Sequence, residues 1–232
     1  FLSDVFFPTL LHHGISHAIH LGDLVDRRKY INFVTAKRLR EDFLEPLQKH
    51  NIETHIIVGN HDTFYKNTND VNALQELLYG KYNNITLYTD ATTIILDNKE
   101  ILLLPWITDE NKENTLYNIK NTNAKIALGH LEIQGFEMFR GNVSTHGNDP
   151  SVFDTFDLVC SGHYHHRSSR GNIWYLGSHA EFTWADYGDP RGFHILDTET
   201  LELEFIKNPY TMFSKVWYND IEKDYKPVIN PD

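Results

Sequence analysis

The feature that most constrains this chain is a pattern that occurs four times: a short apolar run, a glycine, and then Asp, Asn or His. The four segments are Ile19-His20-Leu21-Gly22-Asp23, Ile56-Ile57-Val58-Gly59-Asn60-His61-Asp62, Ile126-Ala127-Leu128-Gly129-His130 and Leu158-Val159-Cys160-Ser161-Gly162-His163-Tyr164-His165. Short apolar runs bounded by glycine are typical of buried strands. Loops at the carboxyl ends of strands in an open α/β sheet meet in one crevice. We therefore expect the polar side chains after the four glycines to converge.

The residue types in this pattern suit metal ions. Carboxylate, amide and imidazole donors together favour Mn, Fe, Zn or Ni over Mg or Ca. Two such ions about 3.5–4 Å apart can generate a hydroxide nucleophile and neutralise charge on a phosphate ester. Glycine before each donor lets the backbone turn sharply. One such motif is weak support on its own, but four in one chain predict a metal site for phosphate-ester hydrolysis.

The composition favours one sizeable domain. The chain has 232 residues, of which 41% are hydrophobic, enough for a real core. We expect the domain to cover residues 1–210, and polar residues 211–232 to form a linker or the start of a C-terminal capping region. The single cysteine, Cys160, excludes a disulfide framework and is expected to pack in a strand. The chain shows neither a long apolar run nor a basic-apolar leader, which favours the cytoplasm.

The net charge of −11 argues against unaided binding of nucleic acid, which normally needs a basic face. Two considerations reduce this objection. Part of the negative charge belongs to candidate metal ligands, and bound cations dominate the local field. Affinity for DNA could also come from another subunit.

The periodicity of apolar residues predicts an α/β fold of two β-sheets packed face to face and flanked by helices. Helices are expected from a cap at Asp4 through residues 10–13, and over 32–49 (interrupted at Pro46), 72–79 and 113–120. Strands are expected over 16–21, 54–58, 85–88, 93–96, 101–104, 125–128, 158–161, 173–176, 193–196 and 203–206. The tryptophans Trp106, Trp174 and Trp184 are expected to pack in the core.

Several local motifs, in this order, resemble one family. They are Gly59-Asn60-His61-Asp62 with Tyr65-Lys66-Asn67, Leu104-Pro105-Trp106, Gly129-His130 with Gly135-Phe136, Ser161-Gly162-His163-Tyr164-His165, Tyr175-Leu176-Gly177-Ser178 and Asp189-Pro190-Arg191-Gly192-Phe193. The chain resembles the calcineurin-like metallophosphoesterase superfamily, and within it the SbcD-type DNA repair nucleases, including the recombination endonuclease subunits of T-even-like phages. The resemblance implies a metal-dependent DNA phosphodiesterase, acting as exonuclease and endonuclease in double-strand-break processing or recombination.

The resemblance also implies the metal ligands and the partners. Asp23 is placed as the carboxylate that bridges two divalent ions, which we expect to be Mn. Asn60, His130 and His163 complete one metal site, and His165 joins the other. The implied partners are DNA and an SbcC-type coiled-coil ATPase, with the nuclease acting as a homodimer.

The resemblance gives catalytic roles to the residues beside these ligands. His61 is placed to contact the scissile phosphate and protonate the leaving oxygen, and Asp62 is a candidate to orient the His61 ring. Arg27 follows Asp26 in a stretch similar to one in which an arginine of protein phosphatases grips phosphate, although a surface role is an equal alternative.

The chain departs from the family pattern at its beginning, because no Asp-x-His precedes Asp23. We interpret this as a fragment without its first strand, in which one ion binds well and the second is held only by Asp23 and His165. A degenerate, non-catalytic scaffold is one alternative. A phosphatase acting on phosphoproteins or nucleotides is another, favoured by Asp26-Arg27 and the acidic charge.

Overall fold

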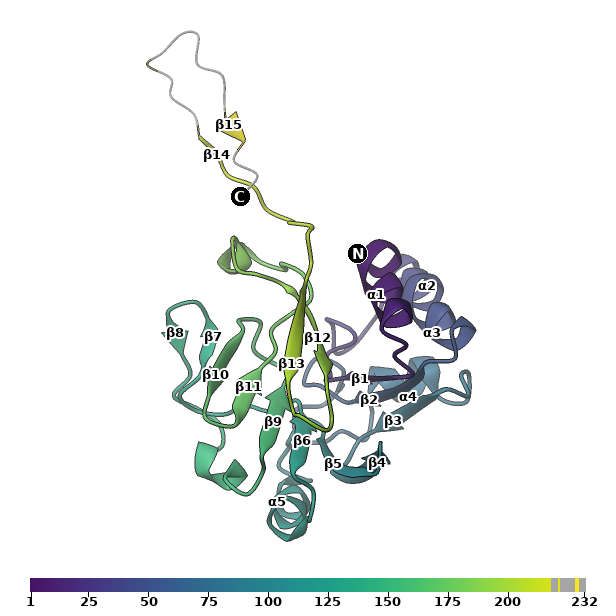
Figure 1. Ribbon diagram of the computed structural model, residues 1–232, viewed down its shortest axis with the longest axis vertical. Helices are drawn as coiled ribbons and strands as arrows, with labels where there is room; N and C mark the ends of the chain where they lie inside the picture. The colour runs from purple at the N-terminus through teal and green to yellow at the C-terminus, as the bar shows by residue number, and fades with distance from the viewer. Residues whose placement is uncertain (218–220, 222–227, 230–232) are drawn as a thin grey trace.

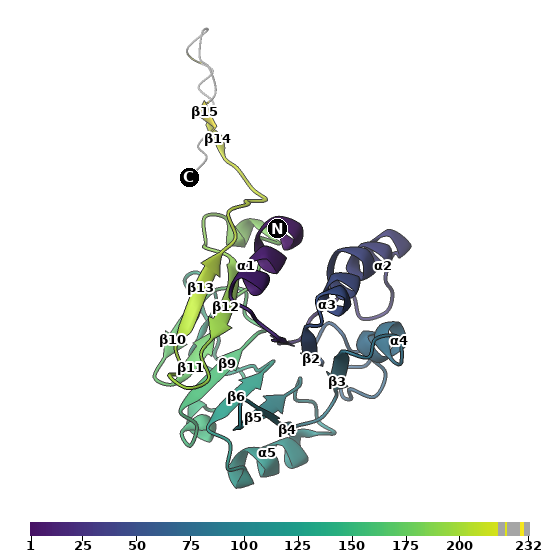
Figure 2. The ribbon, with the colours of Figure 1, turned by 45° about the vertical axis from the view of Figure 1, so that its right-hand side comes forward.

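Two β-sheets face each other and helices cover their outer surfaces (Figures 1 and 2). The computed structural model describes residues 1–217, 221 and 228–229. The smaller sheet is parallel, with the order β1 (His17–His20), β2 (Glu53–Ile57), β3 (Ile85–Tyr88). The larger has the order β10 (Ser168–Arg170), β11 (Ile173–Tyr175), β9 (Leu158–Ser161), β6 (Ile126–Gly129), β5 (Lys99–Leu104), β4 (Thr92–Leu96). The predicted fold class is confirmed.

Three two-stranded ribbons complete the β structure that the described residues form. They are β7 (Glu137–Phe139) with β8 (Asn142–Val143), β12 (Gly192–Leu196) with β13 (Leu203–Lys207), and β14 (Val216–Trp217) with β15 (Val228–Ile229). The predicted linker over residues 211–232 lies partly outside the described residues, so the boundary at residue 210 stays a prediction.

The core between the sheets follows from the alternation of side chains along each strand. On β5, Ile101 and Leu103 face the space between the sheets, whereas Leu102 and Leu104 face outward. Cys160 of β9 lies in the inner layer as a free, buried thiol, and burial raises its pKa to about 12. Its predicted packing role is confirmed.

Helices cover the smaller sheet where the sequence predicted one interrupted helix over residues 32–49. The structure divides it into α2 (Phe33–Leu39), a π-helical segment η2 (Arg40–Leu44) and α3 (Glu45–Lys49). Pro46 lies in the first turn of α3, the position at which its missing N–H is tolerated. Together with α4 (Ala73–Leu78), these helices bury Leu44, Leu74 and Leu78 against the outer face of β2.

Helix α5 (Lys112–Asn121) and the short helix η3 (Pro150–Phe153) cover the larger sheet through Ile119 and Phe153. The chain begins with a π-helical segment η1 (Leu2–Phe6) followed by α1 (Phe7–His12). A further short helix, η4 (Trp184–Asp186), lies in the loop before β12. Within the described part of the chain, every helix is too short or too polar to cross a membrane.

The sheets bring the four Gly-containing motifs to one edge. Strands β1 and β2 run parallel, as do β5, β6, β9 and β11. Asp23 and Asn60 therefore follow the carboxyl ends of two strands of the smaller sheet. His130 and His163 follow the carboxyl ends of two adjacent strands of the larger sheet. These loops face one another across the gap between the sheets.

Candidate metal centre

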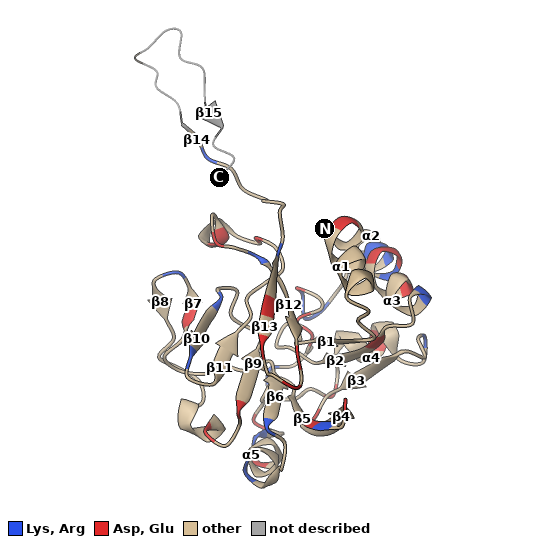
Figure 3. Cartoon of the chain, in the orientation of Figure 1, with Lys and Arg blue, Asp and Glu red and all other residues tan. Residues whose placement is uncertain are grey.

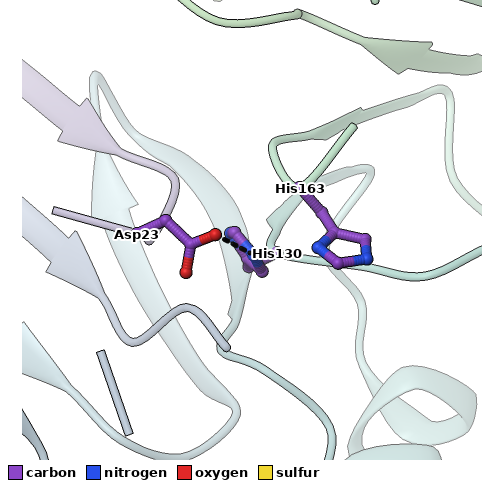
Figure 4. A group of neighbouring side chains, drawn as sticks. All are labelled: Asp23, His130 and His163. Atoms are coloured by element: carbon purple, nitrogen blue, oxygen red, sulfur yellow. Dashed lines mark ion pairs between the residues drawn. The ribbon is translucent and has the colours of Figure 1, made fainter. Parts of the chain in front are cut away.

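The strand ends bring Asp23, Asn60, His130 and His163 into direct contact, and we call these four residues the strand-end cluster. The amide oxygen Oδ1 of Asn60 lies 2.9 Å from Nε2 of His130 and 2.9 Å from Nδ1 of His163. Oδ2 of Asp23 lies 3.2 Å from the same His130 nitrogen. Figure 4 shows the Asp23 carboxylate directed at His130, with His163 beside it. One ligand atom from each of these three residues lies within 4.8 Å of the others.

Two glycines allow this close approach of the smaller sheet's loops. A Cβ at Gly59 would collide with the backbone nitrogen and the carboxylate of Asp23. Gly22 has a φ of +84°, and a Cβ there would lie 2.5 Å from Nδ1 of His130. Only glycine accepts such contacts, and a positive φ also favours it. The glycine of each of these two motifs is therefore needed to bring the ligand-type side chains together.

Asp62 binds backbone rather than the His61 ring. Its carboxylate accepts hydrogen bonds from the N–H groups of Gly59 (2.8 Å), Asp23 (2.8 Å) and Val25 (3.1 Å). The suggested role of orienting His61 is therefore not the arrangement found. Asp62 is completely buried, and burial raises its pKa to about 6 although the hydrogen bonds from the backbone oppose this shift. Its carboxylate fixes the loop of Asn60 against the loop of Asp23.

His61 is held by two hydrogen bonds from opposite ends of the residue. Its backbone N–H donates to Oδ1 of Asp23 at 2.7 Å. Its Nδ1 lies 2.7 Å from the carbonyl oxygen of Asp26. A carbonyl can only accept, so Nδ1 carries the hydrogen and Nε2 is left for another partner. The side chain is 47% exposed, so that partner can reach it from solvent.

The two histidines of the strand-end cluster have opposite pKa shifts. Burial lowers the pKa of His163 to about 3, and the neighbouring His130 adds to the effect. Burial also disfavours charge on His130, but its hydrogen bond and attraction to Asp23 raise its pKa above the usual value. The pKa of Asp23 falls to about 2, because His130 and the His61 N–H outweigh the opposing effect of burial. The cluster thus holds an ionised carboxylate, that of Asp23, and a neutral imidazole, that of His163.

The donor atoms fit a divalent cation. Nδ1 of His130 lies 2.6 Å from the carbonyl oxygen of Leu21, so the neutral ring carries its hydrogen on that side and presents the Nε2 lone pair to the cluster. Two oxygens, from Asp23 and Asn60, crowd the same point. Lone pairs that face one another repel unless a proton or a metal ion lies between them. Mixed oxygen and imidazole donors suit first-row transition metals.

His165 is not part of this group. Among the described residues, the carboxylate and imidazole atoms that come together are those of Asp23, His130 and His163. Nδ1 of His165 instead lies 3.9 Å from Oδ2 of Asp186, whose other oxygen accepts from the Arg191 guanidinium at 2.8 Å. The structure therefore places His165 beside the cluster's loop, facing a carboxylate for which the sequence gave no signal.

Hydrogen bonds link Arg28, rather than Arg27, to the loop of Asn60. Arg27 is exposed and its guanidinium bonds to the Tyr30 hydroxyl. Arg28 donates to Oγ1 of Thr63 at 2.9 Å, and that hydroxyl donates to the Asn60 carbonyl at 3.1 Å. The side chain of Arg28 is thereby directed to the ligand loop. The sequence pointed to an arginine after Asp26 that could bind phosphate, but the spacing did not show whether it was Arg27 or Arg28.

Trp106 was predicted from the sequence only as a core residue, but it lies beside the strand-end cluster. Its ring centroid lies 5.0 Å from that of His163 and 6.0 Å from that of His130. The indole therefore forms an apolar wall beside two imidazoles of the cluster. The motif Leu104-Pro105-Trp106 begins at the last residue of β5, which was the signal for a position at the same edge of the sheet.

Residues 5–167 match the model of the calcineurin-like phosphoesterases, and the chain belongs to this family. The resemblance inferred from the motifs is confirmed. Calcineurin-like phosphoesterases use divalent metals, and the strand-end cluster is a possible site for one.

Two characterised relatives are nuclease subunits. The chain is 40% identical over 218 residues to exonuclease subunit 1 of Enterobacteria phage T4, an alignment that covers 94% of this chain and 63% of that protein. It is 31% identical over 113 residues to the SbcD subunit of the nuclease SbcCD of Staphylococcus epidermidis, covering 46% of this chain and 30% of that protein. The chain thus spans less than two thirds of the length of either relative. A solved structure of a novel archaeal phosphodiesterase is 15% identical, with a TM-score of 0.42 and coverage of 87% of this chain and 88% of that one.

Proposed function

We propose that this protein is a metal-dependent DNA phosphodiesterase, a nuclease of recombination or double-strand-break processing. The observation that carries the proposal is the strand-end cluster, in which a carboxylate, an amide oxygen and two imidazoles meet at the ends of four strands. The names of the two nuclease relatives support DNA as the substrate.

Asp23, Asn60, His130 and His163 would hold a divalent ion, for which we propose Mn because the donors mix nitrogen and oxygen. Asp23 and His165 would hold a second ion. Bound ions in such a site neutralise the charge of a phosphodiester and lower the pKa of water. Trp106 excludes water from one side of the cluster and thereby strengthens these electrostatic effects.

His61 would supply the proton that the departing sugar oxygen needs. Because Nδ1–H donates to the Asp26 carbonyl, Nε2 is the atom that can carry and release this proton. The hydrogen bond from the His61 N–H to Asp23 holds the ring next to the ligand carboxylate. Arg28 is placed to contact a phosphate of the DNA through the face that does not bind Thr63, a role that the sequence had suggested for Arg27.

Among the described residues, cations on helix α2 are paired with acidic neighbours rather than free to bind DNA. Figure 3 shows basic and acidic residues side by side along the helical stretch from α2 through η2 to α3. Lys37 lies 3.9 Å from Glu41, and Arg38 lies 3.3 Å from Asp42, so these cations are already paired. We therefore propose that DNA is held with help from an SbcC-type coiled-coil ATPase, and that the nuclease acts as a homodimer in that complex. Both relatives are named as subunits, which supports this assembly.

The test compares three substrates: linear duplex DNA, a phosphopeptide and bis(p-nitrophenyl) phosphate, each with Mn²⁺, Mg²⁺ or EDTA. We expect cleavage of DNA and of the small diester that requires Mn²⁺ and stops in EDTA. Faster hydrolysis of the phosphopeptide than of either diester would replace the proposal with a phosphatase. Metal binding by calorimetry without hydrolysis of any substrate would replace it with a non-catalytic scaffold.

A further inference from the structure

An exposed group of aromatic side chains lies on the loop between β11 and β12. We call residues 177–191 the aromatic loop. Phe182 is 53% exposed and Trp184 is 61% exposed, which contradicts the expectation that Trp184 packs in the core. Large apolar side chains gathered on a surface commonly mark a binding site.

The aromatic loop is held rigidly, so the exposure of its rings is built into the fold. Oδ2 of Asp186 accepts from the N–H groups of Phe182 (2.8 Å) and Thr183 (2.9 Å). The guanidinium of the buried Arg191 bonds to Oδ1 of Asp186 at 2.8 Å. Buried salt bridges with several hydrogen bonds fix local geometry. The sequence folds this loop around two charges and leaves its aromatic residues in solvent.

The aromatic rings of the loop begin next to His165, which lies beside the strand-end cluster. The ring of Phe182 contacts that of His165 edge to face, with centroids 5.5 Å apart. Two residues further along the chain, Trp184 packs on Phe213 at 4.6 Å. The Lys215 ammonium lies 4.4 Å from the centre of the Tyr187 ring. A hollow of ≈ 300 Å³ is lined by Trp184, Ser214, Lys215 and Val216. An aromatic face and a cation thus border one open depression.

We propose that the aromatic loop binds the unpaired strand of a DNA end, with a base stacked on Trp184 and a phosphate near Lys215. This inference rests on the proposed nuclease function and specifies its substrate as DNA with unpaired nucleotides beside the scissile bond. Bases in a duplex are covered by their neighbours, whereas unpaired bases offer a free face to an aromatic ring. The aromatic loop and its surroundings combine several aromatic rings with one lysine. This combination favours stacking of unpaired bases, whereas binding of a duplex backbone needs a broad basic surface.

The experiment measures the affinity of the whole chain for a fluorescein-labelled oligothymidylate and for a blunt hairpin duplex, both in EDTA so that no hydrolysis occurs. Trp184→Ala should weaken binding of the oligothymidylate about tenfold, since one stacked base typically contributes that much or more. Trp184→Phe should keep most of the affinity. Lys215→Ala should lower the slope of log affinity against log salt by about 0.7. The matched control is Tyr117→Ala on α5, a residue 67% exposed and outside the aromatic loop.

Unchanged affinity of Trp184→Ala for the oligothymidylate would overturn the proposal. An equal loss on the duplex would overturn it too, because the loop would then contact backbone rather than bases. If Trp184→Ala instead changed the sedimentation of the protein and left DNA affinity intact, the loop would be a protein contact. Binding in EDTA is independent of catalysis. If Trp184→Ala loses affinity only for the oligothymidylate, the stacking contact is supported even if the protein shows no Mn²⁺-dependent cleavage. If the protein cleaves DNA but Trp184→Ala binds the oligothymidylate with unchanged affinity, the stacking contact is rejected and the nuclease function is not.

Discussion

The strand-end cluster and the aromatic loop each contain a buried carboxylate that accepts three backbone hydrogen bonds. Asp62 accepts from Gly59, Asp23 and Val25. Glu181 accepts from Gly188 at 3.2 Å, Met212 at 2.7 Å and Phe213 at 3.1 Å. Both carboxylates tie together two segments that are distant in sequence.

The two regions differ in what the tied segments present. Around Asp62, the segments are strand ends, so their polar side chains point at one another and bring carboxylate and amide oxygens within 2.9–3.2 Å of an imidazole nitrogen. Around Glu181, an ion-pair network is already formed, because Arg191 binds both Asp186 (2.8 Å) and Asp189 (2.9 Å). Ligand-type oxygen and nitrogen atoms at the first region favour a metal ion, whereas ion pairs at the second hold a rigid surface.

The largest effect is expected at Asp23, the only carboxylate in the strand-end cluster. Asp23→Ala removes the ligand that we assign to both ions, so hydrolysis should be abolished and Mn²⁺ affinity should fall below detection in a calorimetric titration. Hydrolysis of bis(p-nitrophenyl) phosphate is the activity readout.

Asp186→Ala is the comparison variant, because it removes a carboxylate close to His165 but outside the cluster. It should keep tight binding of one Mn²⁺ ion. Activity of Asp23→Ala close to that of the unmodified protein would contradict the assignment of the cluster.

His61→Ala should give the next largest effect, on rate rather than on metal binding. General acid–base assistance typically contributes about 10²–10⁴-fold, so hydrolysis should fall by that factor with metal occupancy near normal. A substrate with a good leaving group needs less protonation, so bis(p-nitrophenyl) phosphate should be affected less than DNA. Loss of one bound ion in the variant would instead make His61 a ligand.

The positions of several strands and the convergence of the cluster could be anticipated because the signal is local. An apolar run followed by glycine identifies a buried strand end, and parallel strands bring such ends together. The predicted strands at residues 85–88 and 158–161 coincide with β3 and β9. Pro46 likewise predicted an interrupted helix, because proline cannot donate its N–H within a helix.

The partners of Asp62 and the exposure of Trp184 could not be anticipated from the sequence. Asp62 follows His61 directly, which suggested a hydrogen bond between them, but its carboxylate turns toward N–H groups from residues 23, 25 and 59. Those contacts depend on how two loops pack. Trp184 is exposed because Asp186 and Arg191, which occupy the interior of its loop, leave the indole outside. The strands β7, β8 and β10 are short and lack an apolar pattern, so periodicity gave no signal for them.

Asp62→Asn should have an intermediate effect on both stability and metal binding. An amide has one acceptor oxygen, so its NH₂ group must face at least one of the three backbone N–H donors. The free energy of unfolding in urea should fall by about 2 kcal/mol. The Asn oxygen can keep the contacts of Oδ2 with Gly59 and Asp23, so the contact that is lost is the one with Val25. Mn²⁺ affinity should fall by about 10–100-fold, because Val25 lies in the same loop as Asp23 and its displacement moves the ligand carboxylate. Unchanged Mn²⁺ affinity would show that the two loops hold their geometry without this carboxylate.

Glu181→Gln should have the smallest effect and gives the sharpest contrast with Asp62→Asn, since both replace a buried carboxylate by its amide. The Gln oxygen can take the place of Oε2, which accepts from Met212 and Phe213, so only the longer contact with Gly188 is lost. We expect the free energy of unfolding to fall by about 1 kcal/mol. Mn²⁺ affinity should stay within about twofold, because within the described residues the Glu181 carboxylate bonds to the aromatic loop and to residues 212–213 rather than to the strand-end cluster. Urea denaturation and calorimetry on the two variants side by side provide the measurement. If Glu181→Gln weakened Mn²⁺ binding as much as Asp62→Asn, the two regions would be coupled, and the assignment of separate roles to the cluster and the loop would fail.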